Sequence, residues 1–287
     1  MNNIKQIFIF IGPAFVLYIA LILYSVIFNI YLSFHKWSGF GNPKFVLFNN
    51  YIKLFKDDLF WRSLAHNFVI MICALTIMLT ISLILAIILD MGFRGSGLLK
   101  NVFFLPVVVS IVVIGLVWAR ILEPSNGPLN LALASVAPDS LTQKWLGDPN
   151  MALVSVISIW IWRHVGYGMI LFLAGLQNIP KSIIEAAKID GANTWKVITK
   201  ITIPTLRPVI LTVMLWSVIL SFKIFPLIHI LTGGGPYHST EVLNTYMYRV
   251  AFQNYNFGYA STIATILLII MVIASVINRK VNQFNSR

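Results

Sequence analysis

The chain has 287 residues, of which 58% are hydrophobic and only 10% are charged. A soluble globular domain is about 45–50% apolar and about 25% charged, so this composition excludes an ordinary soluble enzyme and a disordered chain and indicates a membrane protein. In a membrane protein the net charge of +12 fixes orientation through the loops, so we expect no nucleic-acid partner. The single cysteine, Cys73, excludes an intramolecular disulfide and a multi-cysteine metal cluster, and we expect no metal site.

Six apolar runs are each long enough to cross the hydrocarbon core, which takes about 20 helical residues. Barrel strands would show segments of about ten alternating residues, whereas these runs are longer and apolar on every face. The sequence therefore predicts an all-α polytopic membrane protein with six transmembrane helices. The runs are 7–32, 68–89, 102–122, 151–176, 208–231 and 259–277.

The first run is too long for the apolar segment of a signal peptide, about 7–15 residues, so we expect a retained helix. Lysines and arginines are more numerous in the inner segments if the N-terminus is inside, which favours N-in and C-in termini. We divide the chain into an N-terminal helix with its outer loop (1–66), a five-span core (67–278) and a cytoplasmic tail (279–287). The outer loop is rich in aromatic residues, and both interfacial anchoring and contact with a solute-binding protein account for them.

Charged or titratable side chains interrupt two of the spans. Arg163 and His164 divide the fourth run, and Lys223 interrupts the fifth beside Ser217 and Ser221. A charged side chain at mid-bilayer costs about 2.5–3.5 kcal/mol, so such residues face a cavity or a partner. For Arg163 and Lys223, a partner subunit and an anionic group of a substrate both stay open.

The connector between the fourth and fifth runs, residues 177–205, is long and internally ordered. Pro180 suits the start of a helix, and Gly191 suits the left-handed position that ends one. The intervening segment has an apolar side and a charged side. An isolated helix this short is marginal in water, so we expect it to dock. The chain's own bundle and a separate protein are both open as the docking surface.

Small and acidic residues recur in this connector at a fixed spacing: a Glu-Ala-Ala triplet, a glycine shortly after it, and a proline thirteen residues further on. They are Glu185, Ala186, Ala187, Asp190, Gly191, Ala192 and Pro204. This pattern, before the fifth of six spans, resembles the EAA loop of binding-protein-dependent ABC importer permeases. The resemblance implies the ABC type-1 permease architecture in the cytoplasmic (plasma) membrane. It also implies that the short helix couples to a separate ATPase, with Glu185 meeting a basic group and Gly191 allowing close backbone contact.

Other stretches resemble the sugar-importer branch of that family, which includes the maltose permeases. One is a glycine-rich turn that we place on the outer face, near the gate. The resemblance implies a carbohydrate cargo, a di- or oligosaccharide, and a glycerol phosphate stays open as the alternative because similar permeases carry it. The implied partners are a second homologous permease in a heterodimer, two copies of a cytoplasmic ABC ATPase and an extracytoplasmic solute-binding protein. The turn consists of Gly233, Gly234, Gly235 and Pro236.

In maltose-type permeases the sugar contacts a mid-membrane face of the fourth and fifth helices, and the resemblance implies such a face here. Tyr167 would stack on a pyranose ring, and two serines would bond sugar hydroxyls. Leu220 and Ile224 cannot form hydrogen bonds, which departs from maltose-like recognition. Hydrogen bonding between packed helices is the alternative role of this face. The matching positions are His164, Tyr167, Ser217, Leu220, Ser221 and Ile224.

The chain has no G-x-x-x-x-G-K-[ST] phosphate loop. We therefore expect a non-catalytic subunit without a cofactor of its own, and ATP and Mg on the partner ATPase. A self-sufficient ion-coupled secondary transporter is the alternative, but it would need acidic groups well inside the spans, and none occurs there. A membrane-embedded enzyme ranks last, since the spans hold no pair of carboxylates and no H-E-x-x-H motif.

Overall fold

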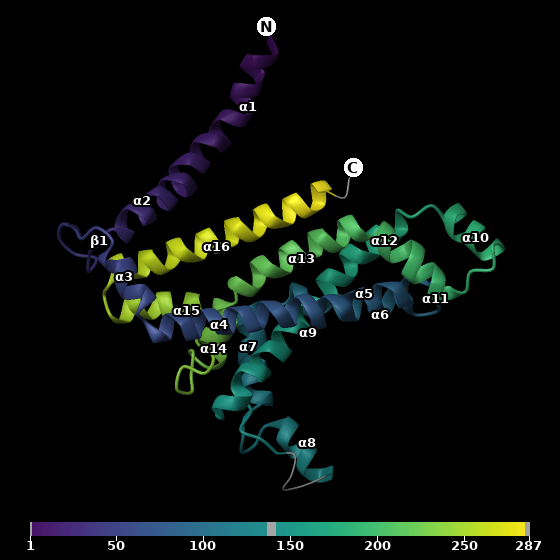
Figure 1. Cartoon of the computed structure of the whole chain (residues 1–287). Helices are drawn as coiled ribbons and strands as arrows, with labels where there is room; N and C mark the ends of the chain where they lie inside the picture. Colours follow the sequence, from purple (N-terminus) through teal and green to yellow (C-terminus); the bar gives the residue numbers. More distant parts are fainter. Residues whose placement is uncertain (1, 137–141, 285–287) are drawn as a thin grey trace. The chain divides into compact units, whose positions relative to one another are not determined.

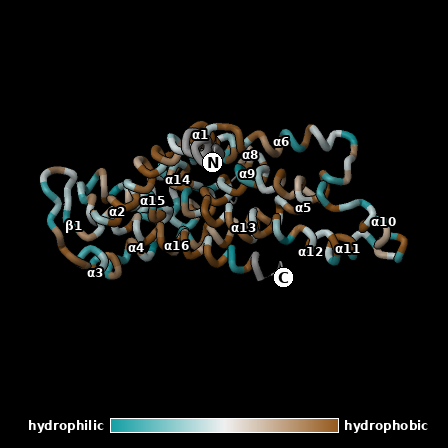
Figure 2. The backbone as a smooth tube through the Cα atoms, turned by 90° about the horizontal axis from the view of Figure 1, so that it is seen from above, coloured by the Kyte–Doolittle hydropathy of each residue, from teal (hydrophilic) through white to brown (hydrophobic). Residues whose placement is uncertain are grey.

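The computed structural model describes residues 2–136 and 142–284, and helices make up nearly all of its regular structure (Figure 1). The strands in this described part are β1 (His35–Lys36) and β2 (Lys44–Phe45), which pair antiparallel as a short hairpin. The predicted all-α class is confirmed. Along the backbone in Figure 2, the long helices are mainly brown, for hydrophobic residues, and teal segments are concentrated in the connections.

Four helical stretches are long and apolar enough to cross a membrane, and they coincide with the first, second, fourth and sixth predicted runs. They are Phe10–Ser33, Asp58–Asp90, Pro149–Gln177 and Phe257–Val281. The first two contain a π-helical turn, η1 (Ile19–Leu23) between α1 (Asn2–Tyr18) and α2 (Tyr24–Ser33), and η2 (Ala74–Met78) between α4 (Asp58–Cys73) and α5 (Leu79–Asp90). The other two are α9 (Pro149–Gln177) and α16 (Phe257–Phe284).

The third predicted run is bent rather than straight. It forms α6 (Ser96–Val108) and α7 (Ile111–Ile121), which meet at 98°. Pro106 lies within α6, and its ring removes one helical donor and crowds the preceding turn. The backbone then becomes extended at Val109, so the run is two helices around a break.

The fifth predicted run is also broken, so its prediction as one helix is wrong. α13 (Arg207–Phe222) ends at Lys223, and α14 (Phe225–Leu231) begins after it with Pro226 in its first turn. A helix that continued through Pro226 would clash with the carbonyl four residues earlier, at Phe222. A second bent pair precedes this break, where the helical segment Thr194–Thr205 meets Arg207–Phe222 at 66°. The described part of the chain contains four spans, or up to six where each of the two bent pairs, Ser96–Val108 with Ile111–Ile121 and Thr194–Thr205 with Arg207–Phe222, counts as one.

The remaining helices are short and lie in the connections between the spans. They are α3 (Asn49–Phe55), α8 (Pro128–Val136), α10 (Lys181–Ile189), α11 (Thr194–Val197), η3 (Ile198–Thr202), α12 (Ile203–Thr205), α15 (Leu243–Tyr248) and η4 (Arg249–Gln253).

The chain divides into two compact units. The first comprises the chain up to Trp61 together with Tyr246–Ile270, and the second comprises Arg62–Thr245 and the chain from Met271 onward. The first therefore joins the N-terminal helix and the hairpin to the first half of α16. The sequence-based domain boundaries stay a prediction.

In the second unit α9 is the central helix, and α5 and α6 pack against it (Figure 1). Small residues allow this close approach. A Cβ on Gly166 would lie 2.0 Å from the carbonyl oxygen of Phe103. On the other side of α9, the hydroxyl of Ser82 donates a hydrogen bond to the carbonyl of Val165 at 2.9 Å. Close packing through small residues and hydroxyl bonds is typical of membrane helices.

Candidate functional site

The inner connector forms the helix that the sequence predicts. α10 begins after Pro180 and ends at Ile189, and Gly191, two residues later, has a φ of +81°, the left-handed conformation expected after a helix end. The N–H of Gly191 donates to the carbonyl of Lys188 at 3.1 Å, and the N–H of Ala192 donates to that of Ala187 at 2.9 Å. These two bonds form a Schellman motif, which satisfies carbonyls at the helix end.

All residues of α10 are at least partly exposed, which is unusual for a helix with an apolar side. Ile184 packs partly against the neighbouring core cluster of α5, α9 and α13. Ile183 is 46% exposed, Ile189 is 86% exposed, and Trp195 on α11 is 71% exposed. An exposed apolar patch outside the spans is typical of an interaction surface. Sequence reasoning missed Trp195, although a large aromatic residue in a polar inner loop is a usable signal.

Space is open around the end of this helix. Within the described residues, a Cβ added to Gly191 would meet no atom within 4 Å. Glu185, Ala186 and Asp190 are exposed to solvent. The backbone of this turn is therefore accessible to another protein, while the coupling role of its residues stays a prediction.

Three aromatic or imidazole rings meet where α9 lies beside α13. Tyr167 stacks on Trp216, with ring centroids 4.0 Å apart and planes 17° apart. His164 lies edge-on to Trp216, with centroids 5.8 Å apart, and its Nδ1 lies 2.7 Å from the carbonyl oxygen of Trp160. The structure therefore brings His164 and Tyr167 together around Trp216. Sequence reasoning missed this tryptophan, which directly precedes Ser217.

The two candidate serines are fully buried, and their hydroxyls are already in use. Ser217 donates to the carbonyl of Val213, and Ser221 donates to that of Val218, both at 2.7 Å.

Ile224 lies beyond the end of α13, so it does not extend the helical face that the sequence assigns to it. Leu220 and Tyr167 are half-buried, whereas His164 and Ile224 are buried.

Arg163 has a structural partner that the sequence did not reveal. Its Nη2 lies 3.3 Å from the carbonyl oxygen of Val107 and 3.2 Å from that of Val109. These carbonyls belong to the break between α6 and α7, where a regular helix would have satisfied them. Arg163 thus acts as a cap for the bent span.

Lys223 is exposed at the gap between α13 and α14.

The outer glycine-rich segment forms the predicted tight turn. Gly233 and Gly234 have φ angles of +60° and +94°, which glycine adopts without a steric penalty. The N–H of Gly235 donates to the carbonyl of Thr232 at 2.9 Å, and the hydroxyl of Thr240 donates to the carbonyl of Gly235 at 2.8 Å. The turn leading to Pro236 is therefore closed by its own hydrogen bonds, and its role as an outer gate stays a prediction.

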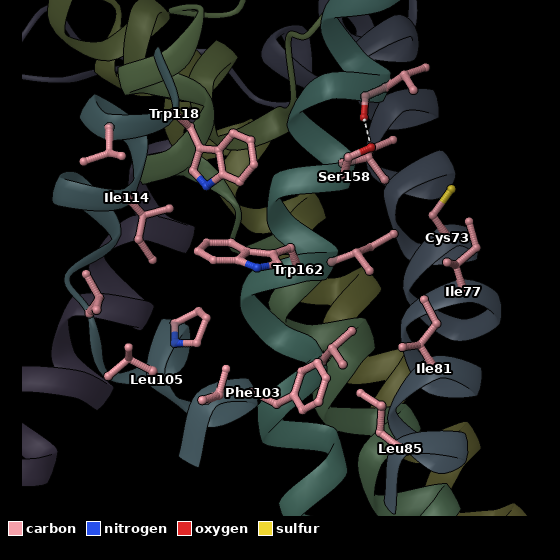
Figure 3. A pocket seen from close by; sticks show the side chains of 18 of the residues that line it. Cys73, Ile77, Ile81, Leu85, Phe103, Leu105, Ile114, Trp118, Ser158 and Trp162 are labelled. Carbon is pink, nitrogen blue, oxygen red and sulfur yellow. Dashed lines mark hydrogen bonds between the residues drawn. The ribbon is translucent and has the colours of Figure 1, made fainter. Parts of the chain in front are cut away.

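A groove of about 940 Å³ lies between α4–α5, α6–α7 and α9 in the second unit (Figure 3). Figure 3 shows Trp118 and Trp162 together on one side, and their ring centroids are 5.5 Å apart. Cys73, Ile77 and Ile81 line another wall. The hydroxyl of Ser158 in this groove donates to a carbonyl of its own helix. Apolar walls of this kind suit acyl chains or another helix, and they offer a sugar few hydrogen-bonding groups.

Comparisons with known proteins agree with this architecture. Residues 78–284 match the family described as "Binding-protein-dependent transport system inner membrane component". A probable ABC transporter permease protein of Pyrococcus horikoshii is 36% identical over 272 residues, which cover 94% of this chain and 93% of that protein. A lactose transport system permease protein of Rhizobium radiobacter is 34% identical, over 93% of this chain and 90% of that protein.

Among solved structures, one chain of a bacterial alginate ABC transporter, crystallised with an alginate pentasaccharide-bound periplasmic protein, has a TM-score of 0.82. It is 23% identical and covers 98% of this chain and 97% of its own length. At that identity the likeness shows a shared fold. The extent of the family match, together with the two relatives above 30% identity, confirms the resemblance carried by the inner connector. The chain belongs to the multi-pass inner-membrane permease family of binding-protein-dependent ABC transport systems.

Proposed function

We propose that this permease carries carbohydrate, a di- or oligosaccharide, through an importer driven by a separate ATPase. Dependence on a separate ATPase is supported by α10, an exposed amphipathic helix that is followed by a glycine in the left-handed conformation. The cargo class is supported by relatives named for lactose, for diacetylchitobiose and for xylose/arabinose, which align with 84% or more of the chain. A self-sufficient ion-coupled transporter does not fit membership of a binding-protein-dependent family.

The surface around α10 supports its assignment as a coupling helix. Ile189 and Trp195 would enter an apolar cleft of the ATPase, and Glu185 would pair with a basic group there. Gly191 has open space around its Cα, so a partner backbone can approach it closely. ATP and Mg would be bound by two copies of that ATPase, and a second homologous permease and an extracytoplasmic binding protein would complete the complex.

The rings around Trp216 support a sugar pathway between α9 and α13. Tyr167 is half-buried and presents an aromatic ring and a hydroxyl, which are the groups that bind a pyranose. Ser217 and Ser221 would contribute only after their hydroxyls turned away from their own helix. Alternating access by movement of packed helices provides such a rearrangement.

Reconstitution tests the cargo assignment. The permease, its partner permease and its ATPase would be placed in proteoliposomes with the cognate binding protein, and uptake of labelled sugars, amino acids and polyols would be measured with and without ATP. We expect ATP-dependent uptake of a di- or oligosaccharide only. Uptake of an amino acid instead would refute the carbohydrate assignment. Uptake driven by an ion gradient without ATP would refute the dependence on an ATPase.

A further inference from the structure

A second, polar hollow of about 450 Å³ lies in the first unit. One wall is the β1–β2 hairpin and the other is the loop that precedes α16. Basic, aromatic and amide side chains share this lining. They include Lys36, Trp37, Asn42, Lys44, Asn254 and Tyr255.

The two lysines of this hollow lie directly opposite each other. Lys36 and Lys44 are cross-strand partners in the hairpin, so their side chains leave the same face. Like charges in that position repel and destabilise a strand pair unless an anion lies between them. Within the described residues, neither ammonium forms an ion pair and the lining of the hollow holds no carboxylate.

The rest of the lining is held in place by backbone contacts. Tyr255 has a φ of +49°, which is an outlier for a bulky residue, and its side chain is 61% exposed. The neighbouring N–H groups of Asn254 and Asn256 fix this loop through 3.0 Å bonds to carbonyls of η4. The indole N–H of Trp37 donates to the carbonyl of Gly41 at 2.9 Å. Local strain that the surroundings hold in place is typical of functional sites.

The hollow lies at the ends of two membrane helices. α2 ends at Ser33, shortly before the hairpin, and α16 begins at Phe257, directly after the other wall. Exposed rings continue along α2 towards the hairpin, since Tyr24 stacks on Phe28 at 5.9 Å and Phe28 on Tyr31 at 6.1 Å. Lysine, tryptophan and tyrosine at the end of such an apolar surface occupy the headgroup level of a bilayer.

We propose that this hollow binds the phosphate headgroup of an anionic phospholipid. The two ammonium groups pair with the phosphate oxygens, and the amides of Asn42 and Asn254 donate hydrogen bonds to phosphate or glycerol oxygens. The rings of Trp37 and Tyr255 lie against the upper part of the acyl chains. A lipid fits better than an acidic segment of a protein, because both walls lead directly into membrane spans.

Binding of lipid to the purified full-length chain tests this site. The chain in neutral detergent would be titrated with short-chain phosphatidylglycerol, phosphatidylcholine and inorganic phosphate, and bound lipid would be counted by native mass spectrometry. We expect preferential binding of phosphatidylglycerol, weakened at least about tenfold in Lys36→Gln/Lys44→Gln. The control Lys56→Gln/Lys144→Gln removes the same charge from exposed lysines that do not line the hollow, and it should bind as the wild type does.

Three results would overturn the proposal. They are equal loss in both double variants, equal binding of phosphatidylcholine, and equally tight binding of inorganic phosphate. Loss of affinity for the solute-binding protein in phosphatidylcholine nanodiscs, with lipid binding intact, would assign the hollow to a protein contact instead. Tyr255→Gly provides a second variant, because glycine adopts the positive φ freely. It should fold normally and bind phosphatidylglycerol more weakly.

Discussion

Gly191 is the residue on which the coupling assignment depends most directly. We expect Gly191→Leu to reduce ATP-dependent sugar uptake at least about tenfold, because the new side chain strains a left-handed residue and blocks the partner's approach. Proteoliposome uptake, together with co-purification of the ATPase, measures the effect.

Gly92 offers a matched control for that change. It also has a positive φ, +72°, and a Cβ there would meet only a carbonyl oxygen at 3.9 Å among the described atoms. Gly92→Leu carries the same backbone strain outside the α10 surface, so it should retain uptake. Equal losses in both variants would show that backbone strain, and not the coupling surface, causes the defect.

Asp57 is a second residue whose chemistry gives a testable result. Its carboxylate accepts hydrogen bonds from the hydroxyls of Tyr246 and Tyr259 and from the N–H groups of Leu59 and Phe60. Burial raises the pKa of Asp57, but these hydrogen bonds together outweigh it, so the pKa lies below its usual 3.8. Burial, and then the bond to Asp57, raises the pKa of Tyr246 above its usual range, so its hydroxyl stays a donor.

A lowered pKa in the folded state means that the ionised form stabilises the fold. This contribution is complete above the unfolded-state pKa, near 3.8, and is lost as the pH falls through the lower folded-state value. We expect Asp57→Asn to lower stability at pH 7 by about 1 kcal/mol or more and to reduce the loss below pH about 4. Thermal unfolding in detergent at pH 7 and pH 3 measures both effects. Asp58→Asn, which changes a neighbouring exposed carboxylate, is the control. If Asp57→Asn kept the wild-type loss of stability at low pH, this role of Asp57 would be disproved.

At the scale of single elements, the bent span of α6 and α7 depends on Arg163. Removing its guanidinium leaves the carbonyls of Val107 and Val109 without this donor, so we expect Arg163→Leu to lower stability by about 1–3 kcal/mol. Arg163→Lys should lose less, since an ammonium retains donors. Thermal unfolding of the two variants in detergent measures this order. Loss of uptake without loss of stability would instead favour contact with an anionic substrate group.

The sequence predicts an element well when local properties of the chain determine it, and poorly when packing between distant segments determines it. Apolar length predicts where helices lie, and glycine at 191 predicts where α10 ends, because both are local properties. Hydropathy does not encode direction, so apolar length predicts the runs that contain Pro106 and Pro226 but not the breaks within them. The candidate sugar face is affected most by these breaks. Its residues were placed on one face by helical periodicity, and that periodicity stops where α13 ends at Phe222. The sequence does not place Trp216 in the candidate site, because its contacts with His164 and Tyr167 form only when α9 packs beside α13.

At the scale of the whole molecule, a continuous stretch of chain links α10 to the helix that carries the candidate sugar face, so a displacement of α10 can be transmitted to it. The chain runs from α10 through α11, η3 and α12 into α13, with a 66° bend before Arg207. Leu206 at this bend is buried against α9, where a Cβ on Gly175 would lie 2.8 Å from its side chain. A displacement of the connector would therefore move α13 and α9 together, and these helices carry Trp216 and Tyr167.

Photocross-linking tests this path and the membrane orientation together. In a Cys73→Ser background, which removes the single native cysteine, Ile189→Cys and Tyr237→Cys would each be labelled with a benzophenone maleimide in the assembled importer. Both native side chains are 86% exposed, so labelling should be similar. We expect the first to capture the ATPase, with a yield that changes between ATP-bound and nucleotide-free states, and the second to capture the solute-binding protein. Capture of the ATPase from position 237 would reverse the orientation, and no capture from position 189 would remove α10 as the element that receives force.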